Sequence, residues 1–208
     1  MAVLSRSLAC SLLVGLGAAG CSEGRLDAFD RALDGGLPPR DASGMPLLID
    51  DFEDGNTQAL APPGWWYVVN DTTANQVFQV EPEGSSGHAA HTWGDTFTAW
   101  GAGIGLDLRS ESEDFDASAF TELRFRARAA PTSHRTLAVH LLESSSTHFI
   151  LEVELTTEWQ TYVIPFAQTR ADVGGDARVL DREKLSALQL FLFYPERFDI
   201  WLDDFVFH

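Results

Sequence analysis

Alternation of apolar and polar side chains is the feature that most restricts the fold of this chain. Leu123, Phe125 and Ala127 alternate with three arginines, and residues 137–141 and 149–155 repeat the pattern. Successive side chains of a β-strand point to opposite faces, so each segment predicts a strand with one apolar and one polar face. Further strands are expected at 47–53, 64–69, 76–81, 88–93, 98–108, 159–166, 187–194 and 198–207.

The segments between these strands carry turn residues, for example Gly84, Gly87, Gly174 and Gly175. One or two turns of helix are expected near 181–185, with Asp181 as the N-cap. Many short strands at this spacing, without long helical periodicity, predict an all-β fold. The expected architecture is a two-sheet antiparallel β-sandwich.

The N-terminus predicts export. A short start with one charge, Arg6, precedes an apolar run at 8–19, and small residues stand directly before Cys21. This is the secretory pattern, and the apolar run is too short to span a bilayer. Small residues followed by Cys resemble the bacterial lipobox, which implies a signal peptide at 1–20 and a lipid on Cys21. Ordinary signal-peptidase cleavage is the alternative, because Ala18 stands where Leu is commoner.

Residues 21–46 are expected to form the lipidated cysteine and a flexible tether, because glycine and proline pairs interrupt them. The folded domain is expected at 47–208 and contains no cysteine. By resemblance to bacterial sorting rules, Ser22 after the cysteine suggests the outer membrane. The domain would then be lipid-anchored there, facing either the periplasm or the cell surface.

Charge narrows the classes of partner. The chain carries 31 acidic and 14 basic side chains, a net charge of −17. An acidic surface repels phosphates, which argues against nucleic acid and against direct binding to an anionic membrane. A neutral ligand or a cation is compatible with this balance.

Several segments, in order, resemble the jelly-roll domains of the galactose-binding-like class. Among these, they look most like family 11 carbohydrate-binding modules and the domain of complex I intermediate-associated protein 30. The segments that carry the resemblance are 47–56, 100–105, 115–121, 123–128, 158–166 and 198–205. The resemblance covers residues 47–208 and implies a non-catalytic module that binds a glycan or polyol.

In such jelly rolls the first and last strands are neighbours, and a structural Ca²⁺ often lies there. Asp51 and Glu53 share a strand face, Asn56 follows in the turn, and Asp204 could arrive from the last strand. Calcium binds several carboxylate and carbonyl oxygens together. These four residues are therefore the expected calcium ligands; a solvated acidic strand end is the alternative.

Sugars stack on flat aromatic rings while polar side chains bind their hydroxyls. The candidate stacking residues are Trp65, Trp66, Trp93 and Trp100, and the candidate polar contacts are Arg126, His140, Tyr162 and Gln189. Because Trp65 and Trp66 point to opposite faces of one strand, at least one tryptophan is expected to pack in the core.

Two other functions stay open at this point. The same fold could serve as a protein-interaction or envelope-structural module. A glycoside-acting enzyme ranks third: Glu152 and Glu154 share a strand face about 6.5–7 Å apart, within the range of an inverting pair. The sequence contains no G-x-S-x-G elbow, phosphate loop or thiol nucleophile.

Overall fold

The structure, a computed structural model, describes residues 45–84, 87–109, 113–173, 178–193 and 195–208. The predicted signal peptide, Cys21 and nearly all of the tether lie outside the described residues. Among the residues that are described, no helix is long and apolar enough to cross a membrane.

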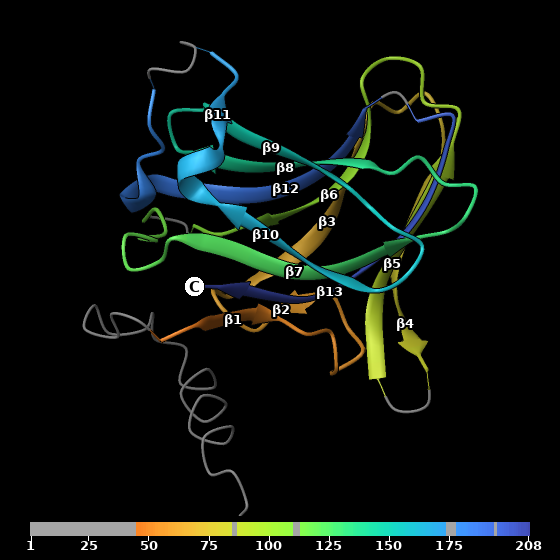
Figure 1. The fold of residues 1–208 in the computed structure, drawn as a ribbon, viewed down its shortest axis with the longest axis horizontal. Helices are drawn as coiled ribbons and strands as arrows, with labels where there is room; N and C mark the ends of the chain where they lie inside the picture. The colour runs from red at the N-terminus through yellow and green to blue at the C-terminus, as the bar shows by residue number, and fades with distance from the viewer. Residues whose placement is uncertain (1–44, 85–86, 110–112, 174–177, 194) are drawn as a thin grey trace, which may run out of the picture.

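Two antiparallel sheets pack face to face (Figure 1). Sheet I has the order β10-β7-β13-β5-β4, and β1 pairs with the C-terminal part of β13. Its strands are β1 (Leu47–Asp50), β4 (Gln76–Glu83), β5 (Gly87–Asp95), β7 (Glu122–Ala129), β10 (Gln160–Pro165) and β13 (Arg197–Phe207).

Sheet II has the order β11-β9-β8-β12-β6-β3-β2. Its strands are β2 (Gln58–Ala59), β3 (Gly64–Asn70), β6 (Gly101–Asp107), β8 (Thr136–Glu143), β9 (His148–Glu154), β11 (Arg170–Ala171) and β12 (Leu185–Phe193). Two single-turn 3₁₀ helices, η1 (Phe166–Gln168) and η3 (Arg182–Lys184), connect strands.

The predicted all-β sandwich is confirmed, because every segment with alternating side chains forms a strand. In β7, Leu123, Phe125 and Ala127 are buried while the arginines between them face outward. The predicted short helix is the 3₁₀ turn η3, where the Asp181 side chain accepts a hydrogen bond from the backbone N–H of Glu183.

The core lies between the sheets and is rich in phenylalanine. Phe52, Phe125 and Phe205 are fully buried, and the last two stack with ring centroids 5.3 Å apart. The first and last strands pair, as the resemblance implied, with Leu47 opposite Phe207. The domain thus closes on itself around one core.

One buried hydrogen bond links the two sheets. Trp66 of β3 is only 3% exposed, and its Nε1 donates to Asp50 Oδ2 of β1 at 2.8 Å. Asp50 Oδ1 accepts from the backbone N–H of Phe52 at 2.9 Å. Burial raises the pKa of Asp50 to about 7. Trp66 is therefore a core residue, and its prediction as a sugar-stacking residue is wrong.

Candidate functional site

The outer face of sheet II carries a row of side chains across five strands. The register places Tyr67 of β3 opposite Gly105 of β6, followed by Gln189 of β12, His140 of β8 and Ile150 of β9. All five lie on the face turned away from the core, because their strand neighbours Trp66, Leu188 and Leu141 are buried. The row therefore brings β3, β12 and β8 onto one continuous surface.

Glycines of β6 form the floor of this face. A Cβ on Gly105 would lie 2.8 Å from the Tyr67 ring, and one on Gly103 would lie 3.1 Å from the Phe191 ring. The rings of the flanking strands thus lie over the outward glycines of β6, where any larger residue would displace them. Gly101, at the start of β6, has φ +122°, a conformation that favours glycine.

Tyr67 links two polar groups on this face. Its hydroxyl donates to Asp107 Oδ1 at 3.0 Å and accepts from Gln189 Nε2 at 3.5 Å. Burial raises the pKa of Tyr67, so the hydroxyl stays protonated at neutral pH. A pocket of about 230 Å³ opens here, lined by Tyr67, Asp107, Arg109, Leu142, Glu143, Ser144, Ser146, His148, Ser186, Ala187 and Gln189.

The two most exposed tryptophans lie at opposite ends of the same face. Trp65 is 61% exposed and shares its strand face with Tyr67. Trp100 is 39% exposed and lies edge-on to Phe191, with ring centroids 5.6 Å apart. Aromatic rings with free faces thus flank the glycine floor at both ends. Such rings can stack on the apolar face of a sugar.

Asp71 fixes the loop that carries Trp100. Its Oδ2 accepts backbone hydrogen bonds from Ala99, Trp100 and Gly101 at 2.8–2.9 Å. Desolvation of Asp71 acts to raise its pKa, but hydrogen bonds from Thr73, Gly101 and Trp100 outweigh it and hold the pKa well below its usual range. The carboxylate therefore stays ionised and keeps its hydrogen bonds to the loop backbone.

His140 belongs to the row but is covered. It is 4% exposed, under Phe191 and His148, and its Nδ1 lies 3.1 Å from His148 Nδ1. Burial, followed by the charge of His148, lowers the pKa of His140 to about 4. His140 is therefore neutral at pH 7 and supports Phe191, and it is too covered to contact a ligand directly.

The outer face of sheet I carries a second set of aromatic side chains. The Arg128 guanidinium lies over the Trp159 and Trp201 rings, at 5.4 and 4.7 Å. On Trp201 stacks His91, at 3.8 Å with an interplanar angle of 10°, and beside His91 lies Trp93 at 4.3 Å. Trp159, Arg128, Trp201, His91 and Trp93 thus form one aromatic stack, which crosses the sheet from β10 toward β4.

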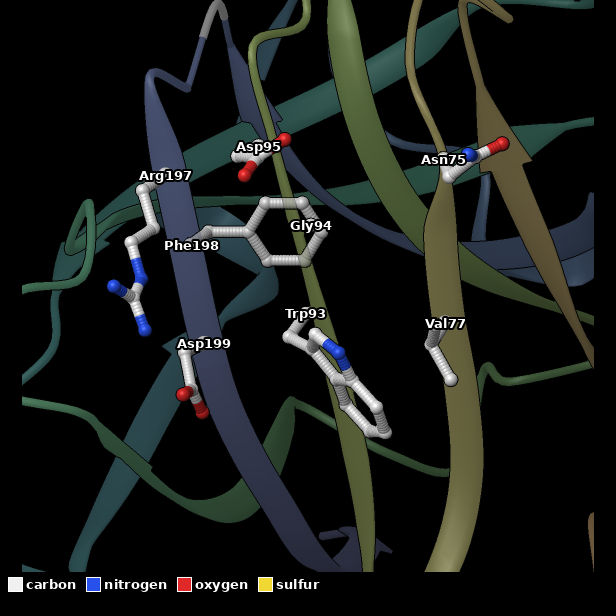
Figure 2. Close-up of a pocket in the computed structure, with 8 residues that line it drawn as sticks. All are labelled: Asn75, Val77, Trp93, Gly94, Asp95, Arg197, Phe198 and Asp199. Carbon is white, nitrogen blue, oxygen red and sulfur yellow. The ribbon is translucent and has the colours of Figure 1, made fainter.

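A pocket of about 420 Å³ lies at the Trp93 end of the aromatic stack (Figure 2). Its lining comes from β13, β5, β4 and the residue before β4: Asn75, Val77, Trp93, Gly94, Asp95, Arg197, Phe198 and Asp199. Trp93 lies between Asp199 and Val77 in the register of the three strands.

The predicted ligand-binding residues are thus divided between two faces and the core. Trp65, Trp100, His140 and Gln189 lie on sheet II, whereas Trp93 and Arg126 lie on the outer face of sheet I. Tyr162, predicted as a polar contact for a sugar, packs against the core instead. Its ring stacks on Phe125 in the core at 5.7 Å, and its hydroxyl accepts from the backbone N–H of Thr156.

Several site residues were not predicted, namely Tyr67, Asp71, His91, Arg128, Trp159, Phe191 and Trp201. For Tyr67 a signal existed, since it shares a strand face with Trp65. For Asp71 the sequence holds no comparable signal, because the loop that its Oδ2 holds, at residues 99–101, lies some thirty residues away in the chain.

Three of the four predicted calcium ligands, Asp51, Asn56 and Asp204, have a side-chain oxygen with another partner. Asn56 Oδ1 accepts from the backbone N–H of Gln58, and Asp204 Oδ2 lies 3.2 Å from Arg126. Asp51 Oδ1 accepts from the backbone N–H of Glu53. Within the described ranges, no three His, Cys, Asp or Glu side chains are arranged to hold a metal ion. Calcium binding stays a prediction, and the function below does not require it.

Glu152 and Glu154, the pair considered for glycoside hydrolysis, are both exposed on the outer face of β9. Glu154 Oε2 accepts a hydrogen bond from Thr136 Oγ1 at 3.0 Å. An acid and base pair needs environments that separate the two pKa values, and these two carboxylates share the same solvent-exposed strand face. The surroundings of this pair give no support for catalysis.

Several solved structures that superpose on this chain are carbohydrate-binding modules. The family 11 module of the cellulosomal cellulase Lic26A-Cel5E of Clostridium thermocellum superposes with a TM-score of 0.58 at 15% identity, over 78% of this chain and 94% of that one. A second family 11 structure from Clostridium thermocellum, in complex with a β-1,3-1,4-mixed-linked tetrasaccharide, gives 0.58 at 14% identity, over 78% and 94%.

The family 30 module of the cellulosomal cellulase Cel9D-Cel44B of Clostridium thermocellum gives a TM-score of 0.57 at 14% identity, over 79% of this chain and 97% of that one. No protein-family profile and no curated protein sequence matches the chain. The described domain therefore has the galactose-binding-like jelly-roll fold of carbohydrate-binding modules. At this level of identity the likeness establishes the fold alone.

Proposed function

We propose that this chain is an exported, lipid-anchored carbohydrate-binding module without catalytic activity. The glycan lies on the outer face of sheet II, over the Tyr67 and Phe191 rings that cover the buried glycines of β6. The observation that carries this proposal is the placement of the exposed Trp65 and Trp100 rings at the two ends of this face, with Tyr67 between them. A shallow aromatic-lined surface of this kind receives the flat face of a sugar ring.

Polar groups beside the rings supply the hydrogen bonds that a sugar needs. Asp107 accepts from sugar hydroxyls, Gln189 both donates and accepts, and the Tyr67 hydroxyl between them fixes their orientation. Acidic groups and a strongly negative chain favour a neutral glycan over an acidic one. The module works by equilibrium binding, and its mixture of rings and hydroxyl partners is typical of sugar recognition.

The likeness to the family 11 module in complex with a β-1,3-1,4-mixed-linked tetrasaccharide supports this function and suggests a first probe. The lipid on Cys21 and the tether would hold the module at the bacterial outer membrane, within reach of envelope or external glycans. The signal-peptide pattern and the small residues before Cys21 support this placement.

The test is affinity electrophoresis of the full-length chain, purified in detergent, through gels that contain neutral polysaccharides. The panel begins with mixed-linkage β-1,3-1,4-glucan. We expect at least one polysaccharide to retard the chain, and Trp65→Ala and Gln189→Ala each to weaken binding about tenfold. Val163→Ala, an exposed position on β10 of sheet I, is the matched control. Binding unchanged in both sheet II variants would reject this site, and retardation by no polysaccharide would reject the function.

A further inference from the structure

The pocket beside Trp93 on the outer face of sheet I combines an apolar wall with polar groups of both kinds. Trp93 and Val77 supply the apolar wall, while Asp95, Asp199 and Arg197 supply carboxylates and a guanidinium (Figure 2). Its volume of about 420 Å³ falls within the range of small-ligand sites. It is also larger than the 230 Å³ pocket on sheet II.

The aromatic stack holds Trp93 in place. His91, its neighbour in the stack, is fixed at both ring nitrogens: Nδ1 lies 2.9 Å from Glu81 Oε2, and Nε2 lies 2.9 Å from Asp199 Oδ1. The opposite face of His91 rests on Trp201. A ring held in this way loses little conformational freedom when a ligand stacks on it, so the pocket is pre-organised for binding.

The far end of the stack is anchored in the same manner. Trp159 Nε1 donates to Glu83 Oε1 at 2.9 Å, and Arg128 lies 3.5 Å from Glu83 Oε2. His91, Trp159 and Arg128 of the stack are thus each held by a carboxylate on sheet I. At the Trp93 end the polar groups face a pocket, and this makes that end the place where a ligand would bind.

The chemistry of the pocket indicates the class of ligand. An indole face binds the apolar side of a sugar ring, carboxylates accept hydrogen bonds from its hydroxyls, and a guanidinium donates to its oxygens. Two carboxylates beside one arginine, on a chain of net charge −17, disfavour an acidic ligand. The ligand that fits is a neutral saccharide.

We infer that the Trp93 pocket is a second saccharide-binding site and that the module is bivalent. The outer faces of sheets I and II point in opposite directions, away from the shared core. The two sites therefore engage two separate glycan segments, and one module bridges two chains. The inference takes its ligand class from the proposed function, but its site and its residues are independent of sheet II.

The test compares sheet I variants with sheet II variants of the full-length chain in detergent. Trp93→Ala, Trp65→Ala and the double variant are measured by affinity electrophoresis on the same polysaccharide panel, with Val163→Ala as the control. Retained folding is checked by circular dichroism, and Trp93→Phe, which keeps a ring, guards against a purely structural effect. We expect Trp65→Ala to keep part of the binding. Adding Trp93→Ala to this variant should weaken the remaining binding about tenfold, and Trp93→Phe in its place should restore most of it.

A second readout measures valence directly. When protein sites and polysaccharide sites are present in nearly equal amounts, the wild-type chain should cross-link the polysaccharide and make the solution turbid. Neither single variant should do so. Binding lost fully in Trp65→Ala and unchanged in Trp93→Ala overturns the second site and leaves the proposed function standing. The reverse pattern keeps the Trp93 site and rejects the sheet II site. Retardation of the wild type by no polysaccharide overturns both.

Discussion

A single exposed carboxylate positions one of the rings on the sheet II face. Asp71 follows β3, and its Oδ2 collects three backbone N–H groups from the loop that ends in Trp100 and Gly101. In the proposed site its contribution to binding is indirect, because its carboxylate is used to orient the loop.

We expect Asp71→Ala to weaken glycan binding about as much as Trp100→Ala, roughly tenfold. Because Asp71 acts through Trp100, the double variant should be little weaker than either single variant. Calorimetric titration with the glycan identified by electrophoresis measures this coupling, with Glu158→Gln as an exposed control. Additive losses in the double variant would show that Asp71 does not act through Trp100.

His140 makes stability depend on pH. Its pKa is about 4 in the folded chain, against about 6.5 in the unfolded chain, because burial disfavours the charged ring. The folded state binds the proton on His140 more weakly than the unfolded state. The contribution of neutral His140 to the free energy of unfolding is therefore fully present above pH 6.5 and is lost as the pH falls toward 4. A difference of this size corresponds to about 3 kcal/mol.

Urea unfolding between pH 7.5 and 4 measures this effect. Carboxylates also titrate in the lower part of this range, so the comparison is with His140→Gln, which cannot take up the proton. We expect the wild type to lose more stability than His140→Gln between pH 6.5 and 4.5. Parallel pH profiles for the two proteins would show that His140 is not the cause.

At the scale of the elements, the Trp66–Asp50 hydrogen bond joins β3 of one sheet to β1 of the other. Trp66→Phe keeps a ring in the core but leaves Asp50 Oδ2 without its donor, and an unsatisfied buried acceptor costs about 1–3 kcal/mol. Trp65→Phe is the matched control, since Trp65 is 61% exposed and should change the free energy of unfolding by no more than about 0.5 kcal/mol. Equal losses in both variants would contradict the assignment of Trp66 to the core.

The strands were predictable because the alternation of their side chains is a local pattern. Which face of a strand is buried could not always be predicted. In β10 both faces carry apolar groups: Tyr162 and Ile164 on one, Val163 on the other. Pairing with β7 decides the matter, since Tyr162 lies opposite the buried Phe125. Adjacent sequence positions could not reveal this contact with a distant strand.

The division of the tryptophans between two sheets was hidden for the same reason. Trp65 and Trp93 lie in β3 and β5, with one strand between them in the sequence, yet β3 belongs to sheet II and β5 to sheet I. The aromatic stack on sheet I joins side chains from β5, β7, β13 and the residue before β10, and non-local pairing sets the order of these strands. The resemblance to carbohydrate-binding modules and the candidate tryptophans indicated an aromatic binding module, and only the strand order separated the two sites.

At the scale of the whole molecule, the proposed design is a lipid, a tether and one sandwich that contains no cysteine. Cells expressing the full chain and fed labelled palmitate should incorporate the label, and Cys21→Ala should abolish incorporation. The alternative, cleavage by the ordinary signal peptidase, predicts a soluble exported protein that carries no label. Incorporation retained in Cys21→Ala would contradict the lipid anchor on this residue.

The central claim is that the outer face of sheet II binds a glycan. Its most direct test is a titration of the ¹⁵N-labelled chain with that glycan, followed by amide chemical shifts. We expect the earliest and largest changes at the amides of Gly103, Gly105 and Gln189 and at the Trp65 indole N–H. Chemical-shift changes confined to β4, β5 and β13, or no changes at a saturating glycan concentration, would contradict binding on sheet II.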